Sequence, residues 1–451
     1  MNKQTKKMTA RLLAVTALLK MENNSGYSNI VIDKSLSESG LEARDKKLAS
    51  IIFYGTLEKI ILLDYYIDSC ASKSKSSMDF EIRTLLRAAV YQILFLEKVP
   101  DFAVVDESVS MTRELKKPKA AGFVNAVLRS VLRRRKELAE KLEDKGQEYV
   151  KYSVPKELIA LWERSYGRAD TKKILDSFME KSCQFIRINS LKTDFEGLKS
   201  RLPEGSLEKS LLIESAAELK TGSHVTELEA FKEGLFHVQD LSAQLVCEIL
   251  DPQPGETVYD LCAAPGGKSF TMAQQMEDGG VLYAFDLYKS RVKLIKSGAE
   301  RLGISCIKAE TADASKWIGT ENADKVLCDV PCSGYGVIRS KPEIRYKSLK
   351  DVKDLPEIQY EILCSGAKLV KSSGLLIYST CTLNPAENEQ VAERFLKSNK
   401  DYKPYPITKL TQFRTREEAE HMLTVMPYAA HSDGFFTAVF QKGNHSLQDA
   451  E

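Results

Sequence analysis

The stretch TVYDLCAAPGGK, from Thr257 to Lys268, decides the fold of the C-terminal part of the chain. An apolar run ends in an acid and is followed at once by a turn of small residues that contains Gly266 and Gly267. Small residues let backbone N–H groups approach a ligand closely where the next helix begins. The turn contains neither GxxxxGK[ST] nor GxGxxG, so it is not a P-loop or a dinucleotide fingerprint. The stretch predicts a strand, a turn and a helix that together bind a nucleotide-like cofactor.

Short apolar runs alternate with helical segments from residue 256 to residue 440. The runs are TVYDLCAA, VLYAFDL, SCIKAETAD, DKVLCDV, GLLIYSTCT and FFTAVFQ. This alternation predicts a parallel sheet with helices on both faces, in which ligands bind beyond the carboxyl ends of the strands. We therefore expect an α/β Rossmann-like domain over residues 235–443.

Acidic residues follow three successive predicted strands, as Asp260, Asp286 and Asp313. Asp286 is placed to accept ribose hydroxyls and Asp313 to contact an adenine edge. One such acid alone is more often a helix cap, but three in register indicate a cofactor site. The predicted site residues are Cys262, Ala263, Ala264, Pro265, Gly266, Gly267, Lys268, Asp286, Asp313 and Asp329.

Two cysteines lie just beyond the next two strands, Cys332 in VLCDVPCSG and Cys381 in LLIYSTCTL. A thiolate at this edge could attack C6 of a cytosine or uracil, which makes C5 nucleophilic enough to accept a methyl group. Asp329 could stabilise or protonate N3 of the ring, which favours cytosine, and Lys268 could hold that acid or the thiolate. The remaining strand-like cysteines are interpreted as small hydrophobic residues, namely Cys247, Cys306, Cys328 and Cys364.

The first 145 residues predict an all-α domain, because apolar residues recur there at helical spacing. The segments are ARLLAVTALLKM, KKLASIIFYGTLEKIILLDYYI, FEIRTLLRAAVYQILFL and AAGFVNAVLRSVLRRRKELAEKL. Residues 146–234 are expected to form linker helices and a small α/β module. Between Arg113 and Lys136 the chain carries nine basic residues and one acid, which predicts either a phosphate-binding surface or a solvated helix face.

Composition narrows the class of protein. The 451 residues are 43% hydrophobic and 28% charged, with a net charge of +2, and no stretch approaches the roughly 18 to 20 apolar residues of a membrane helix. The nine cysteines include no metal-like CxxC pair. We expect a cytoplasmic, monomeric protein with no metal and no membrane partner.

The motifs match a known family. DLCAAPGGK, AFD, TADAS, DVPCSG, YSTCT and DGFFTAVFQK resemble the NOL1/NOP2/Sun class of RNA cytosine-C5 methyltransferases. IRINSLKT and FHVQDLSAQL resemble its RNA-binding and entry segments. FYGTLEK, LLRAAVYQILFLEKVPDFAVVDESV and GFVNAVLRSVLRR resemble the NusB-type antitermination fold. The combination resembles the bacterial members that act on 16S ribosomal RNA.

The resemblance implies the cofactor, the substrate and the division of labour between the thiols. It implies S-adenosylmethionine as methyl donor, with Cys381 as nucleophile and Cys332 assisting release of the methylated product; the DNA enzymes instead use the Pro-Cys cysteine. The expected function is C5 methylation of one cytosine in 16S ribosomal RNA. The alternatives are methylation of another RNA, such as transfer RNA, and a non-enzymatic RNA chaperone or antitermination factor.

Overall fold

Contacts divide the chain into two compact units. The computed structural model describes residues 8–23, 28–71, 78–180, 183–220, 225–316 and 322–444. One unit comprises Met1–Ala160 with Lys341–Tyr346, and the other comprises Leu161–Ser340 with Lys347–Glu451. The three-part division that the sequence indicates, at residues 145 and 234, stays a prediction.

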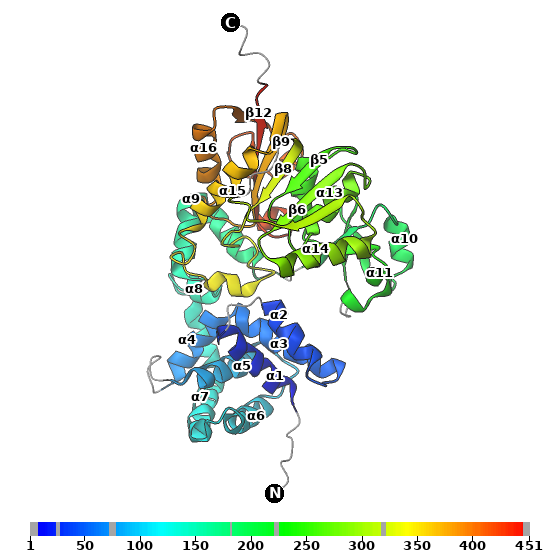
Figure 1. The fold of residues 1–451 in the computed structure, drawn as a ribbon. Coiled ribbons are helices and arrows are strands. Elements are labelled where there is room, and N and C mark those ends of the chain that lie inside the picture. The colour runs from blue at the N-terminus through cyan, green and yellow to red at the C-terminus, as the bar shows by residue number, and fades with distance from the viewer. Residues whose placement is uncertain are drawn as a thin grey trace. The chain divides into compact units, whose positions relative to one another are not determined.

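The first unit is helical, as predicted. Its helices are α1 (Ala10–Asn23), α2 (Ser28–Ser37), α3 (Ala43–Glu58), α4 (Ile60–Cys70), α5 (Phe80–Phe95), α6 (Asp101–Glu114), α7 (Ala121–Glu140) and α8 (Glu148–Lys151) (Figure 1). Helix α5 buries most of its side chains, including Leu85, Leu86 and Val90, in a core shared with α1, α3 and α7. The run from residue 46 to residue 67 is two helices, because Lys59 has non-helical backbone angles.

A distant piece of the chain completes this helical unit. The short 3₁₀ helix η5 (Pro342–Tyr346) contributes a buried Arg345, whose Nη1 donates to the Glu58 carbonyl at 2.9 Å. The Tyr346 hydroxyl accepts a hydrogen bond from the Ile60 backbone N–H at 3.0 Å, just past the break between α3 and α4. No periodicity in the sequence predicts that these residues belong to the helical unit.

The second unit contains the predicted Rossmann-like sheet. Its strand order is β10-β12-β9-β8-β5-β6-β7, and β11 also pairs with β12. The bounds are β5 (Thr257–Asp260), β6 (Val281–Asp286), β7 (Ile307–Thr311), β8 (Ala323–Asp329), β9 (Val370–Thr380), β10 (Tyr402–Pro404), β11 (Met422–Val425) and β12 (Phe435–Lys442). Strands β5 to β9 are parallel, and β10, β11 and β12 are antiparallel to their neighbours. All six predicted strands are confirmed, whereas β10 and β11 were not predicted.

Helices cover both faces of this sheet (Figure 1). They are α12 (Leu241–Leu250), α13 (Gly267–Gln275), α14 (Lys289–Leu302), α15 (Leu355–Ala367) and α16 (Glu389–Ser398). Neighbouring residues of a strand point to opposite faces. Val258 of β5 therefore packs in one core cluster with Ile295 of α14, whereas Tyr259 packs in another with Leu363 of α15.

A smaller antiparallel sheet precedes the Rossmann-like sheet in the chain. It has the order β2-β3-β1-β4, with β1 (Phe185–Ile188), β2 (Leu207–Lys209), β3 (Ala216–Leu219) and β4 (Phe236–Val238). The remaining helices of this region are α9 (Lys156–Ser177), which is broken at Gly167, α10 (Phe195–Ser200) and α11 (Glu229–Lys232). The chain also forms a short α17 (Pro427–Ala430) before β12.

Three polar residues of the IRINSLKT segment, Arg187, Asn189 and Lys192, bond to other parts of the protein. Arg187 is buried and forms an ion pair with Glu248 at 2.9 Å. The Asn189 amide donates to the Gly234 and Leu302 carbonyls, both at 2.8 Å, and Lys192 Nζ donates to two further carbonyls nearby. These bonds join the end of β1 to the end of α14, so they hold the small sheet against the Rossmann-like part of the second unit.

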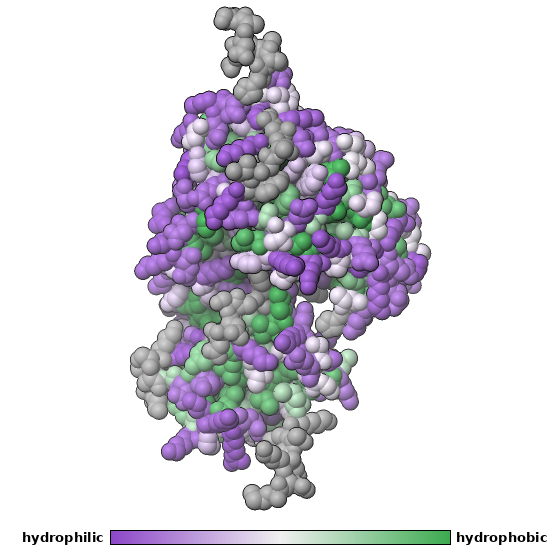
Figure 2. Space-filling view, viewed as in Figure 1, coloured by the Kyte–Doolittle hydropathy of each residue, from purple (hydrophilic) through white to green (hydrophobic). Residues whose placement is uncertain are grey.

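None of the described helices is long and apolar enough to cross a membrane. In the view of Figure 2, hydrophilic residues cover most of the second unit, whereas hydrophobic residues gather over the helical unit.

Replacing Asn189 by alanine is expected to destabilise the second unit. The change leaves two buried carbonyls without their donor, which costs about 2–3 kcal/mol. Denaturant unfolding followed by circular dichroism measures this loss. The control is Ser190→Ala at the exposed neighbouring position, which should change the free energy of unfolding little. Equal losses of stability in both variants would contradict the assigned role of Asn189.

Candidate active site

The two cysteines beyond the strand ends lie side by side. Cys332 Sγ and Cys381 Sγ are 3.2 Å apart, and both residues are half-buried. Strands β8 and β9 are parallel neighbours, and Asp329 of β8 pairs with Ser379 of β9. The turns that follow the two strands therefore begin at the same edge of the sheet. The Ser333 and Thr382 hydroxyls, one residue beyond each cysteine, are 2.6 Å apart. The structure therefore brings the two predicted thiols into direct contact.

Backbone packing holds the two turns together. The Gly336 backbone N–H donates to the Cys381 carbonyl at 3.1 Å, and the Gly434 N–H donates to the Gly336 carbonyl at 2.8 Å. A Cβ atom on Gly336 would lie 2.2 Å from the Gly434 carbonyl oxygen, a distance that no side chain tolerates. Glycine at position 336 is required because three backbone segments converge there.

A half-buried ion pair lies beside the thiols. Lys268 Nζ is 2.7 Å from Asp329 Oδ2, and the Ser379 hydroxyl donates to Asp329 Oδ1 at 2.9 Å. Burial lowers the pKa of Lys268, but the charge and hydrogen bond of Asp329 outweigh that effect, and the charge of Cys381 adds to the rise. The ammonium also lies 4.8 Å from the centre of the Phe435 ring. Lys268 thus stays a cation in the interior of the site.

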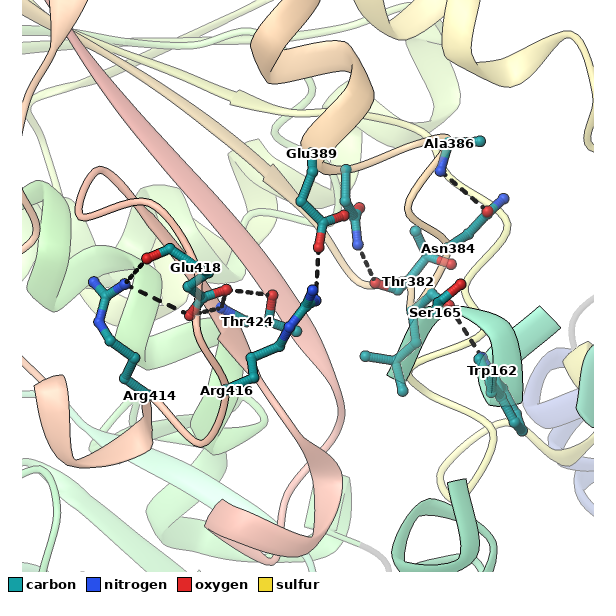
Figure 3. Close-up of polar contacts among 12 residues, drawn as sticks. Trp162, Ser165, Thr382, Asn384, Ala386, Glu389, Arg414, Arg416, Glu418 and Thr424 are labelled. Atoms are coloured by element: carbon teal, nitrogen blue, oxygen red, sulfur yellow. Dashed lines mark hydrogen bonds and ion pairs between the residues drawn. The ribbon is translucent and has the colours of Figure 1, made fainter. Parts of the chain in front are cut away.

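The turn after Cys381 is held from several sides (Figure 3). Trp162, which is fully buried, donates from Nε1 to the Leu383 carbonyl at 3.0 Å. The Asn388 amide donates to the Thr382 carbonyl at 2.9 Å, and Glu389 accepts from Arg416 at 2.7 Å at the start of α16. This support fixes the backbone that carries Cys381.

The glycine-rich turn has the geometry of a ligand cradle. Gly266 has φ = 115°, and a Cβ atom there would lie 2.3 Å from the Phe270 ring. Asp260 is buried at the end of β5, where its Oδ2 accepts from Ser269 at 2.6 Å and its Oδ1 accepts no hydrogen bond from any residue that the structure describes. Burial raises the pKa of Asp260 to about 7. An unpartnered buried acceptor beside a glycine turn fits a polar ligand group.

The other predicted acids follow the neighbouring strands. Asp286 ends β6, is buried, and forms an ion pair with Arg291 at 3.2 Å. Asp313 lies after β7, where its Oδ1 accepts from the Ser315 N–H and hydroxyl, as a local cap does. Cys262, within the turn, is a half-buried thiol whose pKa burial raises well above its usual range. Asp260, Asp286 and Asp313 therefore share one edge of the sheet, although Asp313 is already engaged locally.

Three residues of the site were not predicted, namely Ser379, Glu387 and Phe435. Ser379 has no sequence signal beyond its place in β9, because nothing local indicates that it bonds Asp329. Glu387 lies in NPAENE, directly after the Cys381 turn, and Phe435 opens the last strand in DGFF. The position of both motifs next to predicted strand ends was the signal available.

The basic run of the helical unit is partly neutralised by its own neighbours. Lys117 pairs with Asp79 at 3.1 Å, Arg134 pairs with Glu137 at 3.1 Å, and Arg135 lies 3.4 Å from Asp101. Arg133 and Lys136 of α7 are exposed and have no ion pair with any residue that the structure describes. Among the described residues, no group of three His, Cys, Asp or Glu side chains could hold a metal ion.

A Rossmann-like sheet with this turn and these strand-end residues defines a class of methyltransferases. Residues 247–441 match the family described as 16S rRNA methyltransferase RsmB/F, and residues 8–133 match the NusB family. The chain belongs to the RsmB/F family of 16S rRNA methyltransferases, with a NusB domain before the catalytic domain. The predicted family and fold are confirmed.

Individual relatives extend over nearly the whole chain. The probable ribosomal RNA small subunit methyltransferase B of Bacillus subtilis (strain 168) is 37% identical over 446 residues, which are 97% of this chain and 99% of that protein. The probable ribosomal RNA small subunit methyltransferase B of Synechocystis sp. (strain ATCC 27184 / PCC 6803 / Kazusa) is 33% identical over 96% of this chain and its own full length. The crystal structure of PH0851 superposes with a TM-score of 0.82 at 28% identity, covering 97% of this chain and 100% of that one.

Neutralising Arg133 and Lys136 together is expected to weaken RNA binding and to flatten its salt dependence. Each lost phosphate contact should reduce the log–log slope by up to roughly one unit. Fluorescence anisotropy with an RNA oligonucleotide over a range of salt concentrations measures the slope. Lys400→Ala, at an exposed position of the second unit, is the control and should leave the slope unchanged. If the double variant also leaves the slope unchanged, the basic run is a solvated helix face and does not bind phosphates.

Proposed function

We propose that the protein methylates C5 of one cytosine in 16S ribosomal RNA, through an intermediate in which Cys381 is bonded to C6 of the ring. The observation that carries the proposal is the thiol pair, 3.2 Å apart, with the Lys268–Asp329 ion pair beside it. With two thiols, one can attack the ring and the other can help to resolve the adduct. A reaction that needed only a nucleophile would not require the second thiol. S-adenosylmethionine, when bound, supplies an electrophilic methyl group.

The glycine-rich turn and the acids next to it are the residues that would hold this cofactor. The unpartnered Oδ1 of Asp260 suits a charged amino group, and the carboxylate of Asp286 suits ribose hydroxyls. Asp313 is closest to the expected adenine end. The turn, which comprises Cys262, Ala263, Ala264, Pro265, Gly266 and Gly267, would offer its backbone to the rest of the molecule.

Cys381 is assigned the attack on C6. Two observations support this role beside the family resemblance: the ammonium of Lys268 acts on Cys381 electrostatically, and Cys332 lies within hydrogen-bonding distance of it. A nearby cation and a thiol donor both stabilise a thiolate. Attack places negative charge on the ring, and Asp329 would pass to N3 a proton supplied by the Lys268 ammonium, which donates to it at 2.7 Å. The proton would return by the same route when Cys381 leaves.

Cys332 is assigned the resolution of the adduct. Once Cys381 is a thioether, its negative charge no longer opposes ionisation of Cys332, which can release its proton to water. The Cys332 thiolate then takes the proton from methylated C5. The electron pair of that C–H bond restores the C5–C6 double bond, the C6–S bond breaks, and Cys381 leaves as a thiolate.

The names of the relatives support ribosomal RNA of the small subunit as substrate. Bisulfite sequencing of ribosomal and transfer RNA from a deletion strain, with and without the complementing gene, tests this directly. One cytosine of 16S ribosomal RNA should lose its protection in the deletion strain. Loss of protection only in transfer RNA would overturn the assignment of the substrate.

Cofactor binding should depend on Asp286. Calorimetry with S-adenosylmethionine should show binding by the intact protein, and Asp286→Ala should weaken it by roughly 10- to 100-fold, the effect of one or two hydrogen bonds to a charged acceptor. Asp401→Ala, at an exposed position, is the control. Absence of binding at millimolar ligand, or equal affinity in Asp286→Ala, would refute the assigned site.

The two cysteine variants should fail in opposite ways. Cys381→Ala should abolish turnover and form no covalent complex, because the attacking atom is gone. Cys332→Ala should still attack and methylate, and then stall as a protein–RNA adduct that survives denaturing gel electrophoresis. If Cys381→Ala traps the adduct and Cys332→Ala does not, the roles are reversed and the assignment used by the DNA enzymes holds.

A further inference from the structure

Glu387 is a carboxylate buried beside the thiol pair. Its side chain is inaccessible to solvent and forms no ion pair with any described residue. Oε2 accepts from the Ser333 backbone N–H at 2.8 Å and from Gln359 Nε2 at 2.9 Å, and Oε1 accepts from Asn384 Nδ2 at 2.8 Å. Burying a carboxylate without a cation is costly even when neutral donors surround it. Three N–H donors face its two oxygens, so the surroundings are built for a carboxylate, and a glutamine would turn its own N–H group toward a donor.

The position of this carboxylate links the two reactive turns. Glu387 lies on the turn that follows Cys381, and its acceptor bond to the Ser333 N–H reaches the residue directly after Cys332. The hydroxyl of Tyr378, in β9, donates to the Glu387 carbonyl. The carboxylate therefore ties the Cys332 turn to the Cys381 turn at the base of the site.

The charged groups around the two thiols differ. The Lys268 ammonium and the buried Asp433 carboxyl both act on Cys381, whereas Glu387 acts on Cys332. The other groups that face Cys332 are the Cys381 sulfur and the Tyr378 hydroxyl, while Lys347 is engaged with the Ser333 carbonyl at 3.2 Å. The hydrogen bond to Cys381 raises the pKa of Cys332 most, and burial and the charges of Cys381 and Glu387 raise it further.

We infer that Glu387 is a positioning residue that assigns the two thiols their roles, by holding the Cys332 turn in place and by putting a buried negative charge on the Cys332 side of the pair. This inference rests on the proposed function for its meaning in catalysis. The geometry on which it stands, however, is independent of RNA and cofactor. The carboxylate is also close enough to make the Cys332 thiolate, once formed, a stronger base for the C5 proton.

The inference predicts the pH at which Cys332 reacts. Cys381→Ser removes the neighbouring thiol, and iodoacetamide labelling of Cys332 is then followed against pH by peptide mass spectrometry. Adding Glu387→Gln should move the midpoint of labelling to lower pH, because a negative charge beside the thiol is lost. A shift of one pH unit corresponds to about a tenfold faster reaction at a pH below both midpoints.

A matched control lies two residues away. Glu389 is partly buried and forms an ion pair with Arg416 at 2.7 Å (Figure 3). Glu389→Gln removes one charge of the same type and should leave the Cys332 midpoint unchanged. An unchanged midpoint in Glu387→Gln, or an equal shift in both variants, would overturn the inference.

A second variant covers the case in which Glu387→Gln does not fold, as judged by circular dichroism. Gln359→Met keeps the carboxylate and removes one of its donors, so its charge is less dispersed and labelling of Cys332 should move to higher pH. A midpoint that stays or falls would contradict the inference. Because labelling needs neither RNA nor cofactor, its outcome is separate from that of the methylation assays.

Discussion

The parallel pairing of β8 with β9 is the constraint on which the rest of the site depends. The register places Asp329 opposite Ser379, and both strands end at the same edge of the sheet. Two turns that are distant in sequence therefore start side by side, and their cysteines meet at 3.2 Å. A slip of one residue would turn alternate side chains to the opposite face and would separate Asp329 from Ser379.

Burial gives the charges at this edge their strength. Coulombic interactions are several times stronger in the interior than in water, so a single lysine or glutamate can bias a neighbouring thiol. Lys268 and Asp329 satisfy one another on the Cys381 side, at 2.7 Å. On the Cys332 side, Glu387 accepts from three neutral donors and forms no ion pair within the described part of the chain, so its charge is less compensated. The asymmetry is a property of the arrangement rather than of either cysteine.

Polar motifs in the chain divide into those that meet ligands and those that hold the protein together. Arg187, Asn189 and Lys192 belong to IRINSLKT, the segment that resembles the family's RNA-binding segment, yet all three bond to carbonyl or carboxylate groups of the same unit. In the helical unit, Arg134 and Arg135 are likewise engaged by neighbouring acids. Only exposed cations without such partners, such as Arg133 and Lys136, are free for phosphates.

Local patterns in the sequence determined much of this protein. The spacing of apolar residues indicated the helical unit and all six main strands, and turn chemistry marked the cofactor loop at Gly266 and Gly267. Such features depend on neighbours along the chain, so they can be read without knowing the fold. The residues after each strand, Asp329, Cys332 and Cys381, could be placed at one edge for the same reason.

Tertiary structure alone decided the features that depend on distant parts of the chain. Strands β10 and β11 are short and form by pairing with β12, and η5 joins the helical unit through contacts with α3 and α4. The hydrogen bonds of Asn189 to distant carbonyls, and those that Glu387 accepts from Ser333 and Gln359, likewise depend on distant parts of the chain. A side chain's role is set by the groups that folding brings to it, and those partners lie tens or hundreds of residues away, beyond the reach of any local pattern.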